Sequence, residues 1–384
     1  MKIYIILDNL IYFFKLIYDV IKNIPPISVK LFFNKIIKYQ FISTKFKKKM
    51  YIKPMKYLIC GAGGFIGGHL TKQLIDEGHE VVCADIKPFE YWFQLFEGNK
   101  NYCLDLKEFE NCQKILNGVD YVYNMACNMG GMGFIENNKA ECMLSVLINT
   151  NMLRACLNHK VKKYFFSSSA CVYNGQKQKE TFVPGLKESD AYPAEPEDGY
   201  GWEKLFSERM CRHFTEDFKL ETRVLRYHNV YGPLGTYDGG REKAPAALCR
   251  KIALAKINNQ KEIDVWGDGE QTRSFMYIDD CLIGTRKVFD SELTEVFNLG
   301  SDEQVSINQM IDMIEGIADY KISKNYLLDK PKGVRGRSSD NTLIKKNIKW
   351  APSISLKSGL EKTYKWIYDQ IISGDNSQRF TKSY

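Results

Sequence analysis

The sequence lacks paired cysteines and metal-ligand clusters. Its 11 cysteines stand singly between Cys60 and Cys281, none in a C-x-x-C pair, and no group of cysteines and histidines has zinc-ligand spacing. The pattern therefore indicates neither a disulfide framework nor a metal site. An odd number of dispersed thiols is typical of a reducing compartment, where most cysteines are small buried side chains, so we expect a cytoplasmic protein.

The N-terminal stretch lacks what a membrane span or a signal peptide requires. Its apolar residues are interrupted by Asp8, Lys15 and Asp19, and a charge at mid-bilayer costs about 3 kcal/mol. No small-residue cleavage site follows. We therefore interpret residues 1–54 as an extension outside the fold. A segment lying on a membrane surface, or sequence upstream of a later start, are the alternatives.

The positive charge of the chain belongs to this extension. Residues 1–54 hold 11 Lys against 2 Asp, a net +9, whereas the whole chain carries +8, so residues 55–384 are left near −1. A body without a basic excess gives no reason to expect a nucleic-acid partner.

From Met55 onwards, short apolar runs alternate with amphipathic segments, and no internal repeat occurs. The pattern predicts strands at 56–60, 80–85, 119–126, 161–169 and 221–230, and helices at 65–74, 139–158 and 200–218. Such alternation predicts βαβ units, and therefore an α/β fold with a Rossmann-type, doubly wound parallel sheet.

A glycine-rich turn follows the first predicted strand and begins a helix. Glycines there let the backbone turn tightly and approach a pyrophosphate, which then lies at the N-terminus of the helix. Asp85 ends the second strand, where a carboxylate binds the ribose hydroxyls of NAD and repels the 2′-phosphate of NADP. Asp105, after a third strand, is a candidate neighbour of the adenine. The predicted NAD-binding residues from the turn are Gly61, Gly64, Phe65, Ile66 and Gly67.

These signals predict the domain organisation. We expect an NAD-binding Rossmann domain over residues 55–232. Beyond it the alternation weakens, so residues 233–384 are expected to form mainly a smaller, mixed α/β substrate-binding domain. Part of that segment, about residues 274–300, is expected to return to the Rossmann domain.

Tyr200 and Lys204 form a Tyr-x-x-x-Lys pair on a predicted helix, where positions i and i+4 share a face. An ammonium and a bound nicotinamide would lower the pKa of the phenol and make Tyr200 a usable base. Other pairs with this spacing occur, but this one follows a strand that ends in Ser169, whose hydroxyl completes a triad. We predict that Tyr200 and Lys204 also contact the cofactor.

Further motifs lie outside the turn and the Tyr-x-x-x-Lys pair. They are Met129–Phe134, Ser168–Tyr173, Glu188–Pro196, Arg226–Pro233, Gly239–Pro245, Trp266–Gly269, Gln271–Phe275 and Gly333–Arg337. Together with the turn and the triad, these motifs resemble the extended short-chain dehydrogenases that act on nucleotide-sugars, and more closely the GDP-mannose 3,5-epimerase family. The resemblance covers residues 55–375.

The resemblance implies an isomerase that recycles its NAD. The C4 hydroxyl of GDP-mannose is oxidised with Tyr200 as base, the acidified C3 and C5 positions exchange protons, and C4 is reduced again. In this family the carbon base corresponds to Cys171 and the acid to Lys243. We expect the thiol to become a thiolate beside a bound cation, and the partly desolvated lysine to hold a proton ready to give.

The resemblance also implies a substrate site and a homodimer. Arg337 corresponds to a clamp on the diphosphate, suited to its planar fork of donors. The other predicted substrate-binding residues are Gly131, Met132, Gly133, Ser169, Asn229, Arg241 and Lys243.

Three other functions share parts of this pattern. A 4,6-dehydratase needs acidic residues just after the serine, where this chain has Ala170 and Cys171. A 4-epimerase leaves Cys171 and Lys243 without a role. A non-catalytic NAD-binding protein leaves the whole set unexplained. Without the resemblance, Cys171 reads as a packed thiol and Lys243 as a solvated side chain.

Overall fold

The computed structural model describes residues 54–331, 333–374 and 378–382. The chain divides into two units, Met1–Pro54 and Met55–Tyr384. The predictions for the N-terminal extension therefore lie outside the described residues, apart from Pro54. No helix among the described residues is long and apolar enough to cross a membrane.

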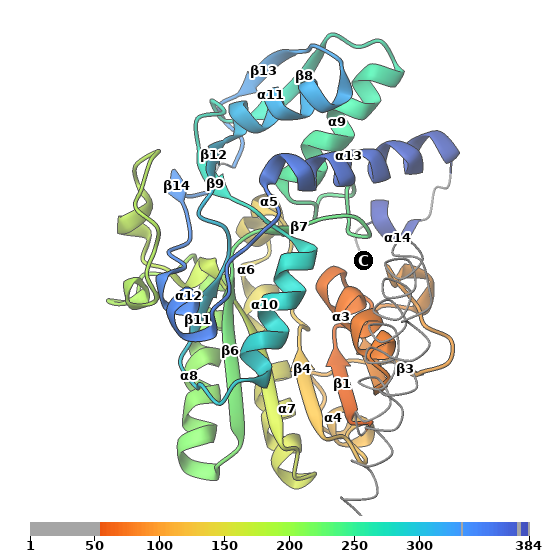
Figure 1. Ribbon diagram of the computed structural model, residues 1–384, viewed down its shortest axis with the longest axis vertical. Helices are drawn as coiled ribbons and strands as arrows, with labels where there is room; N and C mark the ends of the chain where they lie inside the picture. Colours follow the sequence, from red (N-terminus) through yellow and green to blue (C-terminus); the bar gives the residue numbers. More distant parts are fainter. Residues whose placement is uncertain (1–53, 332, 375–377, 383–384) are drawn as a thin grey trace, which may run out of the picture. The chain divides into compact units, whose positions relative to one another are not determined.

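A seven-stranded sheet occupies the centre of the fold (Figure 1). Its strand order is β11-β6-β5-β4-β1-β2-β3, and every neighbouring pair is parallel. The strands are β1 (Lys56–Cys60), β2 (Glu80–Asp85), β3 (Lys100–Cys103), β4 (Tyr121–Asn124), β5 (Lys163–Ser169), β6 (Glu221–Tyr227) and β11 (Phe297–Leu299). The order reverses between β1 and β4, so the sheet is doubly wound as predicted.

The two faces of the sheet bury two separate cores, because side chains alternate along a strand. On β1, Tyr57 and Ile59 join one core, whereas Leu58 and Cys60 join the other. Helices α3 (Phe65–Asp76) and α10 (Ile278–Asp290) cover the first face, and α4 (Phe109–Ile115), α7 (Ser145–Asn158) and α8 (Tyr200–Phe218) cover the second. Burial on both faces explains why the strands read as nearly continuous apolar runs.

Two predicted elements are interrupted in the structure. The helix expected at 139–158 is divided into α6 (Lys139–Met143) and α7, and the strand expected at 221–230 ends at Tyr227. Asn229 has a φ of 44°, which a strand cannot accommodate. The chain leaves the central sheet there, and β7 (Val230–Tyr231) pairs with β10 (Met276–Tyr277) instead.

The remaining elements lie mainly beyond the carboxyl edge of the sheet, with α9, α11, α13, β8 and β13 grouped in the upper part of Figure 1. Small sheets join β8 to β13, and β9 to both β12 and β14. The bounds are α9 (Ala244–Ile257), β8 (Glu262–Trp266), β9 (Thr272–Ser274), β12 (Gln304–Ser306), α11 (Ile307–Ala318), β13 (Ser323–Leu327), β14 (Gly336–Arg337) and α13 (Leu356–Ser373). The shorter helices are α5 (Met132–Asn137), α12 (Thr342–Ile348), α14 (Gln378–Thr381) and the 3-10 turns Phe89–Tyr91, Ala170–Val172, Gly175–Gln178 and Glu188–Ala191.

The C-terminal segment is tied down by one residue. Phe380 is buried against Phe93, Tyr237 and Trp366. Its carbonyl oxygen accepts hydrogen bonds from the Tyr237 N–H at 3.1 Å and the Thr236 hydroxyl at 3.0 Å. These contacts hold α14 next to the glycine-rich turn region.

A buried ion pair joins α8 to the sheet. The guanidinium of Arg226, on β6, donates two hydrogen bonds to the Glu208 carboxylate, at 2.9 and 2.7 Å. Ser168, on β5, donates a third. The side chains of the pair are 3% and 4% exposed, so neither charge has water as an alternative partner.

Replacing Glu208 with alanine should lower the free energy of unfolding by about 3–5 kcal/mol, because the arginine is left charged and unpaired inside the protein. Urea denaturation measures the change. The matched control is Glu216→Ala, which removes an exposed pair with Arg212 on the same helix and should change stability little. Equal effects of the two substitutions would contradict a special role for the buried pair.

Candidate active site

The glycine-rich turn is held against β2 by the backbone. Gly61 has a φ of 81°, and its N–H and that of Ala62 both donate to the Ala84 carbonyl, at 2.7 and 3.1 Å. A Cβ on Gly67 would stand 2.1 Å from the Gly61 carbonyl oxygen. No side chain caps the N-terminus of α3. The turn is therefore a bare backbone cradle beside a helix N-terminus, as a pyrophosphate requires.

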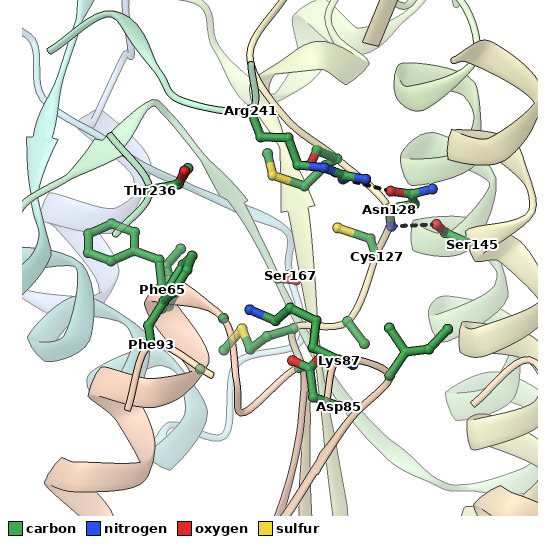
Figure 2. Close-up of a pocket in the computed structure, with 18 of the residues that line it drawn as sticks. Phe65, Asp85, Lys87, Phe93, Cys127, Asn128, Ser145, Ser167, Thr236 and Arg241 are labelled. Carbon is green, nitrogen blue, oxygen red and sulfur yellow. Dashed lines mark hydrogen bonds between the residues drawn. The ribbon is translucent and has the colours of Figure 1, made fainter. Parts of the chain in front are cut away.

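Asp85 lies at the end of β2, beside Lys87 (Figure 2). Burial raises the pKa of the Asp85 carboxyl, and Lys87 opposes that shift through its charge and a backbone hydrogen bond of 3.0 Å. The Lys87 ammonium donates to the Gly63 carbonyl at 2.6 Å and lies 4.1 Å from the centre of the Phe93 ring. Lys87 thus fixes the carboxylate and the turn together.

A cavity of about 600 Å³ extends from this cradle along the carboxyl edge of the sheet. The residues that line it include Asp105, after β3, as well as Tyr200 and Lys243. The predicted cofactor residues that line it are Gly61, Gly64, Phe65, Ile66, Gly67, Asp85, Asp105 and Tyr200. A glycine cradle, a buried carboxylate and a phenol along one cavity fit a dinucleotide such as NAD.

Ser169 and Tyr200 line the far end of this cavity, whereas Lys204 lies behind it. The Lys204 side chain is 1% exposed and its ammonium is 3.2 Å from the Glu203 carboxylate. It lies 5.5 Å from the centre of the Tyr200 ring. Burial opposes the charge of Lys204, but Cys127 and Glu203 outweigh burial and raise its pKa. The triad therefore contains a permanent cation.

The lowered pKa that is expected for Tyr200 beside Lys204 and a bound nicotinamide stays a prediction. Burial raises the pKa of Tyr200 well above its usual value, and the hydrogen bond with Ser169 only opposes that shift. The phenol loses its hydration, and its electrostatic interactions with Cys127, Cys171 and Glu203 raise the pKa further.

The thiolate that is expected for Cys171 beside a bound cation also stays a prediction. Cys171 lies in the 3-10 turn after β5, and its N–H donates to the Ser169 hydroxyl at 3.2 Å. Burial, followed by the nearby Glu197 carboxylate, raises the pKa of the thiol to about 12, although Arg337 and Ser169 act in the opposite direction. The resting thiol is therefore protonated near neutral pH.

Lys243 precedes α9 and lines the cavity. Burial lowers the pKa of its ammonium, and the electrostatic interaction with Cys171 opposes that shift. A lowered pKa makes the ammonium a better acid, as the predicted role requires.

The predicted substrate-binding residues are spread over more than this cavity. Arg241 lines it and donates to the Asn128 side chain at 2.8 Å (Figure 2). The Gly131 N–H donates to the Arg241 carbonyl at 3.1 Å, and Gly133 faces Trp266. Met132 lines a second cavity of about 570 Å³.

Two predicted substrate contacts engage protein partners instead. Arg337, on β14, is 4% exposed and donates to the Gln178 and Glu197 side chains and to the Cys171 sulfur, rather than lining the first cavity. The Asn229 amide donates to the Ser274 carbonyl at 3.1 Å. Their roles toward a diphosphate stay predictions.

Three residues of the site were not predicted. Cys127 points its sulfur into the cavity from the loop after β4 (Figure 2), Lys87 braces Asp85, and Glu197 contacts Arg337. Lys87 could have been suspected from its position two residues after Asp85. Glu197 had no local signal, because its partner Arg337 comes from a distant segment.

The chain matches the model of the NAD dependent epimerase/dehydratase family over residues 57–300. It belongs to this family. Among named relatives, it is 48% identical over 318 residues to GDP-mannose 3,5-epimerase 1 of Oryza sativa subsp. japonica, covering 83% of this chain and 82% of that protein. GDP-mannose 3,5-epimerase of Arabidopsis thaliana is 46% identical over the same length, with 83% of each chain covered. The predicted resemblance is confirmed.

Solved structures share the fold. UDP-glucose 4-epimerase from Thermotoga maritima, with UDP-glucose, superposes with a TM-score of 0.75 at 25% identity and covers 83% of this chain and all of that one. UDP-glucuronic acid 4-epimerase from Bacillus cereus, in complex with UDP-glucuronic acid and NAD, gives 0.70 at 28% identity, with 82% and 99% covered. NAD is accordingly the cofactor of this chain.

A methyl group at the closest point of the cradle should weaken NAD binding. Gly67→Ala places a carbon against the Gly61 carbonyl, and the displacement costs about 1–3 kcal/mol, or about tenfold or more in affinity. Calorimetric titration with NAD measures the loss. Gly316→Ala is the control, since no atom lies within 4 Å of its added carbon. Unchanged affinity in Gly67→Ala would show that the turn does not hold the cofactor.

Proposed function

We propose that the chain catalyses the NAD-dependent epimerisation of GDP-mannose at C3 and C5, giving GDP-L-galactose, GDP-L-gulose or both. The observation that carries the proposal is the placement of Cys171 and Lys243 next to the Ser169–Tyr200 pair. The thiol and the ammonium interact electrostatically, and Cys171 and Tyr200 share one small core cluster. The names of the relatives support the same substrate.

Oxidation of the sugar begins at its C4 hydroxyl. Bound NAD would supply the oxidising and reducing capacity. Tyr200 takes the hydroxyl proton, Ser169 holds the oxygen by a hydrogen bond, and Lys204 stabilises the phenolate that is needed for this step. The paired, buried Lys204 keeps its charge throughout, because its pKa is raised.

A ketone at C4 makes the hydrogens at C3 and C5 acidic. Cys171 removes a proton from one face of the sugar, and Lys243 returns a proton to the other face, so that the configuration inverts. The lowered pKa of Lys243 favours that transfer. A second cycle at the other carbon uses the same pair after Cys171 has released its proton to water and Lys243 has taken one up.

The alternatives explain less of this site. A dehydratase requires carboxylic acids where Ala170 and Cys171 stand, and a 4-epimerase requires neither Cys171 nor Lys243. A non-catalytic binder would have no use for a buried, charged Lys204 beside Tyr200. The predicted cytoplasmic location stays a prediction.

Incubation with GDP-mannose in deuterated water should place deuterium at C5 and C3, as read by NMR of the sugar. Cys171→Ala should reduce this exchange by about a hundredfold or more, because the carbon base is lost, while the 4-keto sugar still forms and is detected by mass spectrometry. Cys156→Ala, which changes a buried thiol on α7, serves as the control. Inversion at C4 without exchange would indicate a 4-epimerase, and loss of water a dehydratase.

We further propose that the protein is a homodimer built on α6, α7 and α8. These adjacent helices expose large apolar side chains. Trp202 and Phe206, four residues apart on α8, are 44% and 53% exposed, and the rest of the patch is Met143, Leu144 and Leu147. An apolar patch of this kind typically marks a protein interface, and a two-fold axis would pair it with itself.

A charge in this patch should separate the subunits. Trp202→Glu is expected to elute from size exclusion, with light scattering, as a monomer, because an unpaired carboxylate cannot be buried in an apolar interface. Phe182→Glu alters an aromatic side chain that is 68% exposed outside the patch and should leave the dimer intact. A monomeric wild type would refute the proposal directly.

A further inference from the structure

Glu197 is fixed to the turn that carries Cys171. Its backbone N–H donates to the Cys171 carbonyl at 2.9 Å, and its own carbonyl accepts from Gly201, in the first turn of α8, at 2.9 Å. A Cβ on Gly201 would lie 2.3 Å from the same Cys171 carbonyl. The segment that begins α8 is therefore packed directly against the backbone of Cys171, and a further carbon atom at Gly201 would not fit between them.

The side chains of Glu197 and Cys171 share Arg337. The guanidinium donates to the Cys171 sulfur at 3.7 Å and, through another nitrogen, to Glu197 Oε1. The carboxylate is 12% exposed. Its other oxygen, Oε2, accepts no hydrogen bond of standard geometry from the described residues. One carboxylate oxygen next to the thiol thus keeps its capacity to accept a proton.

Because Cys171 is protonated at rest, it needs a group that can receive its proton. A thiol whose pKa is raised to about 12 must lose its proton before it can act as a base. The charged and titratable groups that face it are Glu197, Arg337, Arg273, Lys243 and Tyr200. Among these, two are guanidinium cations, one is the proton donor Lys243, and one is the phenol of the C4 step. Glu197 is the remaining group that can receive the proton.

The electrostatic surroundings of Glu197 determine its charge at rest. Burial acts to raise the pKa of its carboxyl, but Arg337, Cys171 and Arg273 outweigh burial and hold it below the usual value. Glu136 faces it from α5 and has its own pKa raised, by burial and then by Glu197. The carboxylate is therefore ionised at rest, so neither of its oxygens holds a proton of its own.

A second cavity connects Glu197 to solvent. It measures about 570 Å³ and is lined by Glu197, Glu136, Lys139 and Asp198. The Lys139 and Asp198 side chains are 53% and 69% exposed, so this cavity reaches the surface. Cys171 does not line it, and neither does it line the first cavity. Glu197 is the group that lies between the thiol and this opening.

We propose that Glu197 is a positioning residue through which Cys171 exchanges its proton with the second cavity. The inference rests on the proposed function. The Cys171 S–H proton passes to a Glu197 carboxylate oxygen, leaving a thiolate and a neutral acid. The thiolate then takes the proton from the sugar carbon, whose electron pair passes into the ketone as an enolate. Glu197 releases its proton to water in the second cavity, and Lys243 supplies the proton that returns to carbon.

The test compares Glu197→Gln with Glu136→Gln, which removes another carboxyl of the same cavity that has no contact with Cys171. In Glu197→Gln, deuterium exchange at C5 near neutral pH should fall by about a hundredfold, while the 4-keto sugar still forms. Exchange should then rise about tenfold per pH unit, because the thiol must ionise directly into solvent. Glu197→Asp, which restores a carboxylate, should recover part of the loss.

Three results would overturn the proposal. They are a Glu197→Gln protein that exchanges at the wild-type rate, one that is slowed equally at every pH, and one in which Glu136→Gln has the same effect. An equal loss at all pH values is what a merely structural role predicts. A thermal melt of each variant separates that outcome from misfolding.

A second measurement does not depend on the substrate. Alkylation of Cys171 by iodoacetamide, followed by peptide mass spectrometry against pH, should have its midpoint at lower pH in Glu197→Gln, because the carboxylate raises the thiol pKa. An unmoved midpoint would refute the coupling. If the wild type leaves GDP-mannose unchanged but the midpoint moves, the proposed function fails while the coupling of Glu197 to Cys171 stands.

Discussion

The parallel register of the central sheet is the constraint on which the site depends. Pairing aligns Cys60 with Ala84 and Asn124, and Ser169 with Tyr227, so the carboxyl ends of these strands lie along one edge. The glycine-rich turn follows β1 at that edge, Asp85 ends β2 there, and Ser169 ends β5 there. A slip of one residue would exchange the two faces of a strand and mismatch both cores. The chemistry is therefore secured by apolar packing some distance below it.

Buried charge is organised around the first half of α8. Lys204 pairs with Glu203, Arg226 with Glu208, and Arg337 with Glu197 just before the helix. Each of these three cations thus has its own carboxylate, which removes most of the cost of desolvation. The neutral acids beside them, Tyr200 and Cys171, gain no such partner, and burial raises their pKa values. The resting site consequently holds its future bases in protonated form.

The sequence was sufficient for the features that depend on local pattern. The Gly61–Gly67 turn, Asp85, and the strands β1 and β2 could be placed because periodicity and spacing determine them. The end of the strand before Asn229 could not be predicted, because asparagine tolerates both signs of φ and only the tertiary structure selects one. The protonation of Cys171 and Tyr200 was likewise out of reach. It depends on burial and on Glu203 and Glu197, whose distances to these groups no sequence spacing reveals.

The anchoring of Phe380 has a consequence for the order in which the site can form. The last strand of the central sheet ends at Leu299, so the sheet can assemble while later segments are still being synthesised. Arg379 and Lys382, on either side of Phe380, line the first cavity and emerge from the ribosome long after the glycine-rich turn, which lines the same cavity. During translation the glycine-rich turn therefore faces a cavity whose lining stays incomplete until residues 378–382 have been synthesised.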